Sequence, residues 1–238
     1  MENAGYIALS RQTALTRQLE VIANNMANVT TPAYKGETLQ FGEYLMQADR
    51  TGSLSFVEES GITRNWAEGS ETPTGNPLDV AIHGDGLFVV STPDGERYTR
   101  KGRFELDAQG QLVTVEGYPV QGDGGPIVIP AEDGEVTISE DGTVSNELGT
   151  LGNIRLVRFA DPNQLQAEGF GLYHGNAPAQ PAEDSSLVQG MVEDSNVNPI
   201  LEMTALIQVT RDYQATQKMI ETEHERSMRA LTSLVGNA

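Results

Sequence analysis

Two long apolar patterns with helical spacing stand at opposite ends of this chain, and the residues between them are typical of short strands and turns. Near the start, steps of four and three residues connect Leu15, Leu19, Ile22, Met26 and Val29. Near the end, a period of about 3.5 residues connects Met203, Leu206, Tyr213, Ile220, Leu231 and Leu234. Two helical ends around a β middle indicate a component of an assembly rather than an enzyme.

Local signals set the limits of both helices. The first is expected from about Ala4 to Asn28, because Pro32 cannot continue a helix. The second is expected to begin at Asn198-Pro199, an N-cap residue followed by proline at the first helical position, and to end near Val235. A helix of about 35 residues with polar positions in its seam is marginal alone and is expected to need several neighbours. The polar seam positions are Thr210, Gln217, His224 and Ser227.

The middle of the chain, residues 76–185, is dense in turns and is predicted to be a β-rich outer domain. Asp-Gly pairs supply the positive φ angles that tight hairpins need, and each pair here stands beside a short β-rich run. These pairs are Asp85-Gly86, Asp94-Gly95, Asp123-Gly124, Asp133-Gly134 and Asp141-Gly142. The Pro- and Ala-rich stretch 175–181 is expected to lead out of this domain as a linker.

The other residues are assigned to two further parts. Residues 36–75 carry apolar side chains too sparse for a core of their own, so they are predicted to be an extended arm or long hairpin that packs on a neighbour. Residues 1–35 and 186–238 are predicted to form a discontinuous helical assembly domain. The predicted fold class is α+β, in which long N- and C-terminal α-helices pair as a coiled-coil-like layer beside a mostly antiparallel all-β central domain.

Charge and composition exclude several classes of partner. The formal net charge is −19, and residues 36–186 carry −17 of it. Such a surface repels nucleic acid and anionic lipid, so neither is an expected partner. No run approaches the roughly 18 apolar residues of a membrane span, and the first residues lack the basic-then-apolar order of a Sec signal. The absence of cysteine excludes disulfides and thiolate metal sites.

The sequence contains no recognisable constellation for catalysis. The three histidines, His83, His174 and His224, have neither the i, i+4 spacing of a helical metal site nor a common segment. The Asp-Gly pairs lack the ligand spacing of a calcium loop, and the glycines at 122–125 have no following Lys-Ser or Lys-Thr. We therefore predict no catalytic, cofactor-binding or metal-binding residue, and no cofactor.

Three blocks of sequence are specific enough to indicate a family. Residues 23–35, which read ANNMANVTTPAYK, resemble the N-terminal signature of the flagellar rod, hook and hook-associated proteins. Residues 74–104 are similar to the start of the β domain in rod and hook proteins, and residues 189–203 resemble the family's C-terminal block. Ala33 departs from the pattern, because the family usually has glycine there. The resemblance covers most of the chain except the acidic stretch 120–185.

The resemblance implies an axial component of the bacterial basal body that transmits torque for motility. Residues 1–12 and the chain length look most like those of proximal rod members, with distal rod and hook-family members as the alternatives. The implied partners are copies of the chain itself and other proximal and distal rod proteins, with the membrane ring and the export apparatus as further candidates. The implied location is the periplasmic rod, reached by flagellar type III export rather than by Sec.

In this interpretation the helices of many subunits form the inner wall of a tube, and contacts that do not close generate a helical filament. Two questions stay open. Asn24, Asn25 and Asn28 either form hydrogen bonds between helices or only end a helix, and the apolar seams either join subunits or form an intramolecular core. The predicted assembly interface is Leu15, Leu19, Ile22, Asn24, Asn25, Met26, Asn28, Met203, Leu206, Tyr213, Ile220, Leu231 and Leu234.

Two other functions remain as alternatives. One is a freestanding binding module, in which residues 76–181 bind a ligand and the helices serve as a stalk. The other is a hydrolase or metal enzyme whose activity depends on His83 or His174.

Overall fold

The computed structural model describes residues 2–48, 52–130 and 136–235, and it describes side chains for residues 6–42, 61–130, 136–229 and 232. The chain divides into two compact units. The first, here called the helical unit, comprises Met1–Asn28, Glu37–Asn65 and Val197–Ala238. The second, here called the β unit, comprises Val29–Gly36 and Trp66–Asn196.

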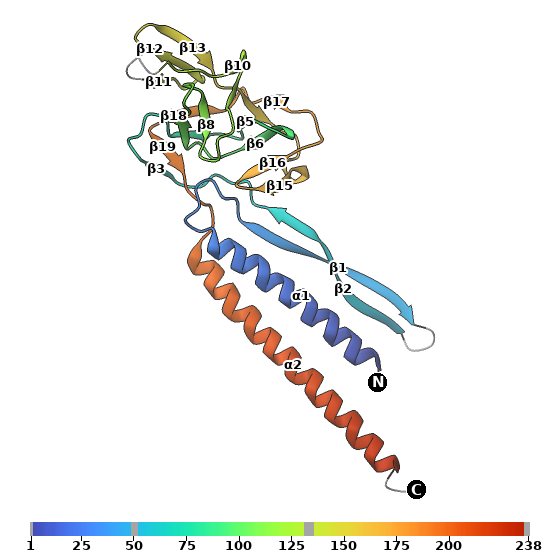
Figure 1. Cartoon of the computed structure of the whole chain (residues 1–238). Helices are drawn as coiled ribbons and strands as arrows, with labels where there is room; N and C mark the ends of the chain where they lie inside the picture. Colours follow the sequence, from blue (N-terminus) through green and yellow to red (C-terminus); the bar gives the residue numbers. More distant parts are fainter. Residues whose placement is uncertain (1, 49–51, 131–135, 236–238) are drawn as a thin grey trace. The chain divides into compact units, whose positions relative to one another are not determined.

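The helical unit contains two helices and one hairpin. Helix α1 spans Glu2–Ala27 and helix α2 spans Pro199–Val235. The hairpin pairs β1 (Glu37–Ala48) with β2 (Gly52–Arg64) in antiparallel register. Figure 1 shows α1 between α2 and the hairpin, with the two helices antiparallel and α2 continuing past the N-terminal end of α1. Residues 37–64, within the segment predicted to be an arm or hairpin, therefore pack along a helix of the same chain.

Local hydrogen bonds fix the start of α2 and the end of α1 at, or within one residue of, the positions that the sequence predicted. At the start of α2, the Asn198 side-chain oxygen accepts hydrogen bonds from the backbone N–H groups of Ile200 (3.0 Å) and Leu201 (3.3 Å). At the end of α1, the backbone N–H of Asn28 donates to the carbonyl oxygen of Asn24 at 3.2 Å, which closes the last turn. The predicted start of α2 at Pro199 is confirmed, and α1 ends at Ala27, one residue before the predicted position.

A six-stranded antiparallel sheet organises the β unit, with strand order β15-β16-β6-β5-β14-β17. Its strands are β5 (Leu87–Thr92), β6 (Gly95–Thr99), β14 (Leu156–Arg158), β15 (Gln166–Gly169), β16 (Leu172–His174) and β17 (Gln180–Pro181). A short 3-10 helix, Pro162–Gln164, precedes β15. The Asp94-Gly95 turn between β5 and β6 confirms one of the predicted Asp-Gly hairpins, whereas Asp133-Gly134 lies outside the described residues.

Smaller antiparallel sheets complete the β unit. The two-stranded ones pair β3 (Glu71–Pro73) with β19 (Met191–Glu193), β4 (Val80–His83) with β18 (Ser186–Gln189), β7 (Phe104–Leu106) with β8 (Leu112–Thr114), and β9 (Gln121–Gly122) with β10 (Gly125–Pro126). A three-stranded sheet contains β11 (Thr137–Ile138), β12 (Thr143–Asn146) and β13 (Gly149–Asn153). With two helices and these antiparallel pairs, the predicted α+β class is confirmed.

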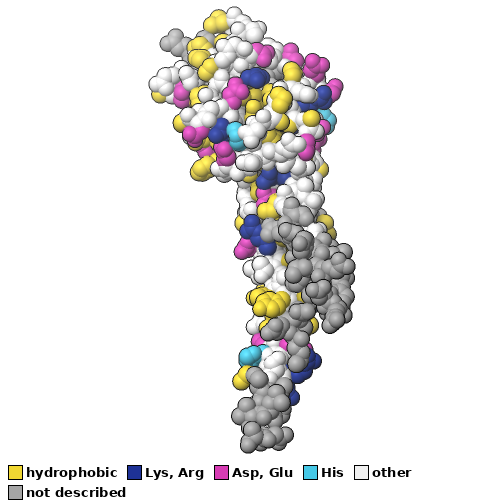
Figure 2. Space-filling view, turned by 90° about the vertical axis from the view of Figure 1, so that its right-hand side faces the viewer, with side chains coloured by type: hydrophobic (Ala, Val, Ile, Leu, Met, Phe, Trp, Pro, Cys, Tyr) yellow, Lys and Arg dark blue, Asp and Glu magenta, His cyan; other side chains and the backbone are white. Residues whose placement is uncertain are grey.

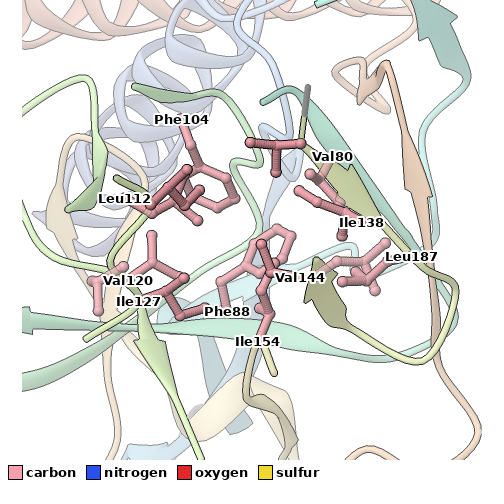
Figure 3. Close-up of a cluster of buried hydrophobic side chains, with 14 of the residues drawn as sticks. Val80, Phe88, Phe104, Leu112, Val120, Ile127, Ile138, Val144, Ile154 and Leu187 are labelled. Carbon is pink, nitrogen blue, oxygen red and sulfur yellow. The ribbon is translucent and has the colours of Figure 1, made fainter. Parts of the chain in front are cut away.

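Strand β5 is buried on both faces and separates two apolar clusters. Because successive side chains of a strand point to opposite faces, Phe88 and Val90 belong to the larger cluster, and Leu87 and Val89 belong to the smaller one. Figure 3 shows the larger cluster, where Phe88 meets Phe104 edge to face with ring centres 5.0 Å apart. Its labelled members are Val80, Phe88, Phe104, Leu112, Val120, Ile127, Ile138, Val144, Ile154 and Leu187.

Two segments are placed differently from the sequence-based expectation. The stretch 175–181 is not a linker, because Ala177 and Ala179 pack against the smaller cluster and β17 pairs with β14. Residues 186–193, which were grouped with the helical domain, form β18 and β19 inside the β unit. Residues 29–36, from the same predicted domain, also belong to the β unit. In both cases the partner strand is remote in sequence, so local composition could not identify the pairing.

Candidate assembly site

The two helices meet along a small apolar seam. Leu15 and Ile22 of α1 and Val209 of α2 are buried there. Four half-buried side chains pack around them: Leu19, Ala205, Leu206 and Tyr213. Within this chain, Leu15, Leu19 and Ile22 of the predicted α1 seam, and Leu206 and Tyr213 of the predicted α2 seam, therefore form an intramolecular core.

The phase of the α2 seam differs from the predicted one. Val209 and Thr216 are buried, and with Leu206, Tyr213 and Ile220 they follow alternating steps of three and four residues. The residues predicted at the alternate positions, Met203, Thr210, Gln217 and His224, are exposed. Placing Thr210, Gln217 and His224 in the seam is thus wrong for the packing within this chain, where the buried polar position is Thr216. Leu206, Tyr213 and Ile220 fit both phases, so the sequence period alone could not separate them.

Asn25 connects all three elements at one end of the helical unit. Its side chain is buried and donates to Glu202 Oε1 of α2 at 3.2 Å and to the Glu37 carbonyl at 2.8 Å. Its own side-chain oxygen accepts the backbone N–H of Glu37 at 2.8 Å. Asn28 instead donates to the carbonyl of Asn24 at 2.9 Å, which is a helix-end contact. Within this chain, Asn25 therefore forms a hydrogen bond between the two helices, whereas Asn28 contacts only the end of its own helix.

The remaining predicted residues lie either outside the apolar cluster of the seam or outside the described side chains. Met26 and Ile220 are half-buried, and Met203 is exposed. Leu231 and Leu234 belong to the last turns of α2, and their side chains lie outside the described residues.

A second apolar surface, exposed in this chain, covers the first turns of α2. Ile200, Met203 and Ile207 are 73%, 56% and 52% exposed, and their spacing of three and four residues places them on one face. We call these three residues the outer stripe. Leu201 of α2, and Tyr6 and Leu9 of α1, are also exposed. Of these, Met203 falls on the apolar seam predicted from the sequence, and the others lie off that seam.

A buried charge cluster holds the N-terminal signature segment inside the β unit. Lys35, Arg100 and Glu193 have side chains only 1%, 5% and 2% exposed. Lys35 Nζ lies 2.6 Å from Glu193 Oε1, and Arg100 Nε lies 2.6 Å from Glu193 Oε2. One carboxylate thus bridges two cations that come from segments far apart in the sequence.

Backbone groups satisfy the rest of this cluster. Lys35 donates to the Ala67 carbonyl at 2.8 Å, and Arg100 donates to the carbonyls of Ile82 and Gly86 at 2.8 and 2.7 Å. Glu193 Oε1 also accepts the Gly69 N–H at 2.8 Å. Buried charges of this kind are tolerated because each one is paired and hydrogen-bonded. No local pattern in the sequence points to this cluster, although Lys35 stands within the recognised signature.

Burial and charge act in opposite directions on the two ends of the ion pair. Burial lowers the pKa of Lys35 below its ordinary value, although Glu193 acts against this. Burial also acts to raise the pKa of Glu193, but the charges of Arg100 and Lys35 outweigh it, so the pKa of this carboxyl lies below its usual 4.5. Glu193 is therefore the anion around which the segment is held at neutral pH.

The signature segment also contains a strained residue. Ala33 has a φ of +56°, in the left-handed region that glycine adopts without cost, and its methyl group is buried. Its backbone N–H donates to the Glu193 carbonyl at 2.8 Å, so the turn is held by the residue that also binds Lys35. The one departure from the family pattern thus lies where the backbone favours glycine.

The possible metal ligands among the described residues are His, Asp and Glu side chains. No group of three or more His, Asp or Glu side chains among them is placed to hold a metal ion. His83 is exposed, with Nδ1 3.6 Å from Glu68 and 3.9 Å from Glu71, and His174 contacts Asn176 at 3.2 Å. Neither helix, over its described residues, is long and apolar enough to cross a membrane.

Comparison with known families gives three matches along the chain. Residues 6–35 match the flagella basal body rod protein family, and residues 81–146 match the flagellar hook protein FlgE/F/G D1 domain. Residues 188–233 match the C-terminal family of the flagellar basal body rod FlgEFG proteins. The first match ends at Lys35 and the third contains Glu193, so the buried ion pair joins the two terminal family segments.

Individual relatives match over nearly the whole chain. The flagellar basal-body rod protein FlgF of Caulobacter vibrioides is 41% identical, with 98% of each chain covered. FlgF of Salmonella typhimurium is 34% identical, with 97% of each chain covered. The flagellar basal-body rod protein FlgG of Caulobacter vibrioides is 35% identical, with 90% of this chain and 93% of the relative covered.

Proposed function

This chain belongs to the FlgF family of flagellar basal-body rod proteins, and on that premise we propose how it builds the rod. It is a structural protein rather than an enzyme, and it assembles with other rod components. We propose that the helix pair is the polymerising element of the proximal rod, and that repeated contacts between helix pairs transmit torque.

The observation that carries this proposal is the outer stripe. One face of α2 is filled by α1 within the same chain, and Ile200, Met203 and Ile207 on the other side are left in solvent. Fully burying a side chain of this size contributes about 1.5 to 3 kcal/mol, so three of them supply a substantial contact at every subunit. A contact between different surfaces of successive subunits does not close and generates a helical filament.

The proposal extends to the partners of this chain, its location and its export route. The partners are copies of this chain and neighbouring proximal and distal rod proteins, with the membrane ring and export apparatus as contacts at the base. The location is the periplasmic part of the basal body, and flagellar type III export is the route. The predicted interface residues Leu15, Leu19, Ile22 and Leu206 support assembly indirectly, because they hold α1 and α2 together and so position the outer stripe.

The test places a charge on the outer stripe. We expect Met203→Asp and Ile207→Asp, each expressed in a flagellated host lacking its own copy, to abolish swimming and to be missing from purified basal bodies. An unpaired carboxylate in a dry contact costs several kcal/mol and recurs in every subunit. The matched control is Ala215→Asp, which adds the same charge to an exposed position of α2 off the stripe. Wild-type swimming by both stripe variants would refute the proposal.

A further inference from the structure

The tip of the β12–β13 hairpin carries an apolar side chain that nothing in the described chain covers. Leu148 is 80% exposed and stands between Glu147 and Gly149. The side-chain oxygen of Asn146 accepts the backbone N–H groups of Leu148 and Gly149, each at 2.9 Å, so the turn is ordered. The backbone of Leu148 is therefore fixed, which lowers the backbone entropy lost when its side chain is buried in a contact.

The β unit also contains a small pocket of about 130 Å³ with an apolar wall. Pro32, Val115, Phe170 and Leu172 supply that wall, and Lys101 and Arg103 stand among the other lining residues. Val115 and Phe170 are 57% and 68% exposed. The pocket thus has the size for one aliphatic side chain and a basic edge.

Phe170 is presented on a strained turn. Its φ is +52°, between Gly169 and Gly171, which also have positive φ angles. A left-handed conformation costs a residue with a Cβ roughly 1 to 2 kcal/mol, and such cost is often retained at sites of contact. The strain holds an aromatic ring in solvent beside the pocket, where burial against a partner would recover free energy.

The charges of the two sites are opposite. Around the pocket, Lys101 lies 3.7 Å from Glu116, and no carboxylate in the described part of the chain forms an ion pair with Arg103. A basic edge is unusual here, because the chain has 34 acidic and 15 basic residues, and acidic side chains are spread over the face of the β unit in Figure 2. At the hairpin tip, Glu147 is exposed beside Leu148.

The two sites lie at opposite ends of the β unit. Figure 1 shows β12 and β13 at one end and β15 and β16, whose turn carries Phe170, at the other. One copy therefore cannot satisfy its own pocket, whereas two copies stacked end to end can. Such a contact joins different surfaces and leaves a free tip and a free pocket at the ends, so it propagates.

We propose that Leu148 of one subunit inserts into the pocket lined by Val115 and Phe170 of a second copy of this chain, with Glu147 beside Arg103. The contact rests on the proposed function, since it adds an outer β-unit contact to the helical contacts of the rod. A tip that fits one pocket would add a second constraint on the spacing of successive subunits.

Cross-linking tests this contact directly, because the chain has no cysteine of its own. In the full-length chain carrying Leu148→Cys and Val115→Cys, expressed in cells that swim, we expect oxidation to give disulfide-linked dimers and longer ladders. The yield should exceed that of Leu148→Cys alone at least tenfold, since a disulfide needs Cα atoms within about 7 Å. The matched control pairs Leu148→Cys with Val128→Cys, an exposed apolar position outside the pocket.

Charge reversal gives a second readout that keeps Leu148. Glu147→Arg alone and Arg103→Glu alone should each lower the amount of chain in purified basal bodies, and the two together should restore it. This arm decides the question if the cysteine variant does not enter basal bodies. Chain that enters basal bodies without either a specific cross-link or charge rescue overturns this contact and leaves the rod assignment intact. Wild-type chain that is absent from basal bodies would instead overturn the rod assignment itself.

Discussion

Replacing Glu193 by glutamine should destabilise the β unit more than removing either cation that it binds. The substitution keeps the shape of the side chain but leaves Lys35 and Arg100 together without the carboxylate that lies 2.6 Å from each. Breaking a buried pair by removing one partner costs about 3 to 5 kcal/mol. Because domain stability totals about 5 to 15 kcal/mol, this is a large fraction of what the β unit has.

Lys35→Met provides the matched comparison. Glu193 then keeps Arg100 and the Gly69 N–H, and the Ala67 carbonyl keeps the Asn196 side-chain donor at 2.7 Å. The burial that lowers the pKa of Lys35 also means that removing its charge recovers desolvation free energy. We therefore expect a loss toward the lower end of about 1.5 to 3 kcal/mol, the scale of one hydrogen bond to a charged group.

Urea unfolding followed by tryptophan fluorescence measures both losses. Trp66 is the single tryptophan, and it packs against Tyr173 in the β unit with ring centres 5.1 Å apart, so its signal reports that unit. In the double variant, the combined loss should be smaller than the two single losses together, because the residues share one interaction. Equal losses for the two single variants, or strict additivity, would refute the view that Glu193 is the centre of the cluster.

The same carboxylate predicts a pH dependence. Because the folded pKa of Glu193 is depressed, its contribution is present above the unfolded value near 4.5 and is lost as pH falls through the folded value. Wild-type stability should therefore fall more steeply below about pH 4.5 than that of Glu193→Gln, measured by the same Trp66 signal. Parallel acid limbs would contradict the depressed pKa.

Three further outcomes are expected. Ala33→Gly relieves the strain of a left-handed alanine, but it removes a buried methyl group and adds entropy to the unfolded state. The free energy of unfolding measured in urea should therefore change by less than about 1 kcal/mol. A larger change in either direction contradicts this balance. Leu206→Asp should unfold the helix seam and abolish motility while the Trp66 transition stays within about 0.5 kcal/mol; swimming would refute the seam's role. Asn25→Ala removes the side chain that bonds both the N–H and the carbonyl of Glu37, so it should lower the protection of α1 in hydrogen exchange. The control Asn24→Ala changes an exposed side chain and should not lower this protection.

The sequence alone located the ends of the helices and the general character of most segments. Asn198-Pro199 and the residues before Pro32 act within one helical turn, and an Asp-Gly pair acts within one hairpin turn. The family resemblance rested on the same kind of contiguous signal, and the matching relatives confirm it. These features are decided by interactions between residues near one another in the chain, which a reading of the sequence can follow.

Only the tertiary structure decided which surfaces those segments share. Leu206, Tyr213 and Ile220 fit two seam phases, and the contact with α1 selected the one that buries Val209 and Thr216. In the sequence, Lys35 is only a charged residue that follows a turn. In the fold, its Nζ lies 2.6 Å from Oε1 of Glu193, which is 158 positions away. The exposed tip at Leu148 and the pocket at Val115 likewise come from separate hairpins. Pairing at such separations depends on the closure of the whole fold, and no local period or motif encodes it.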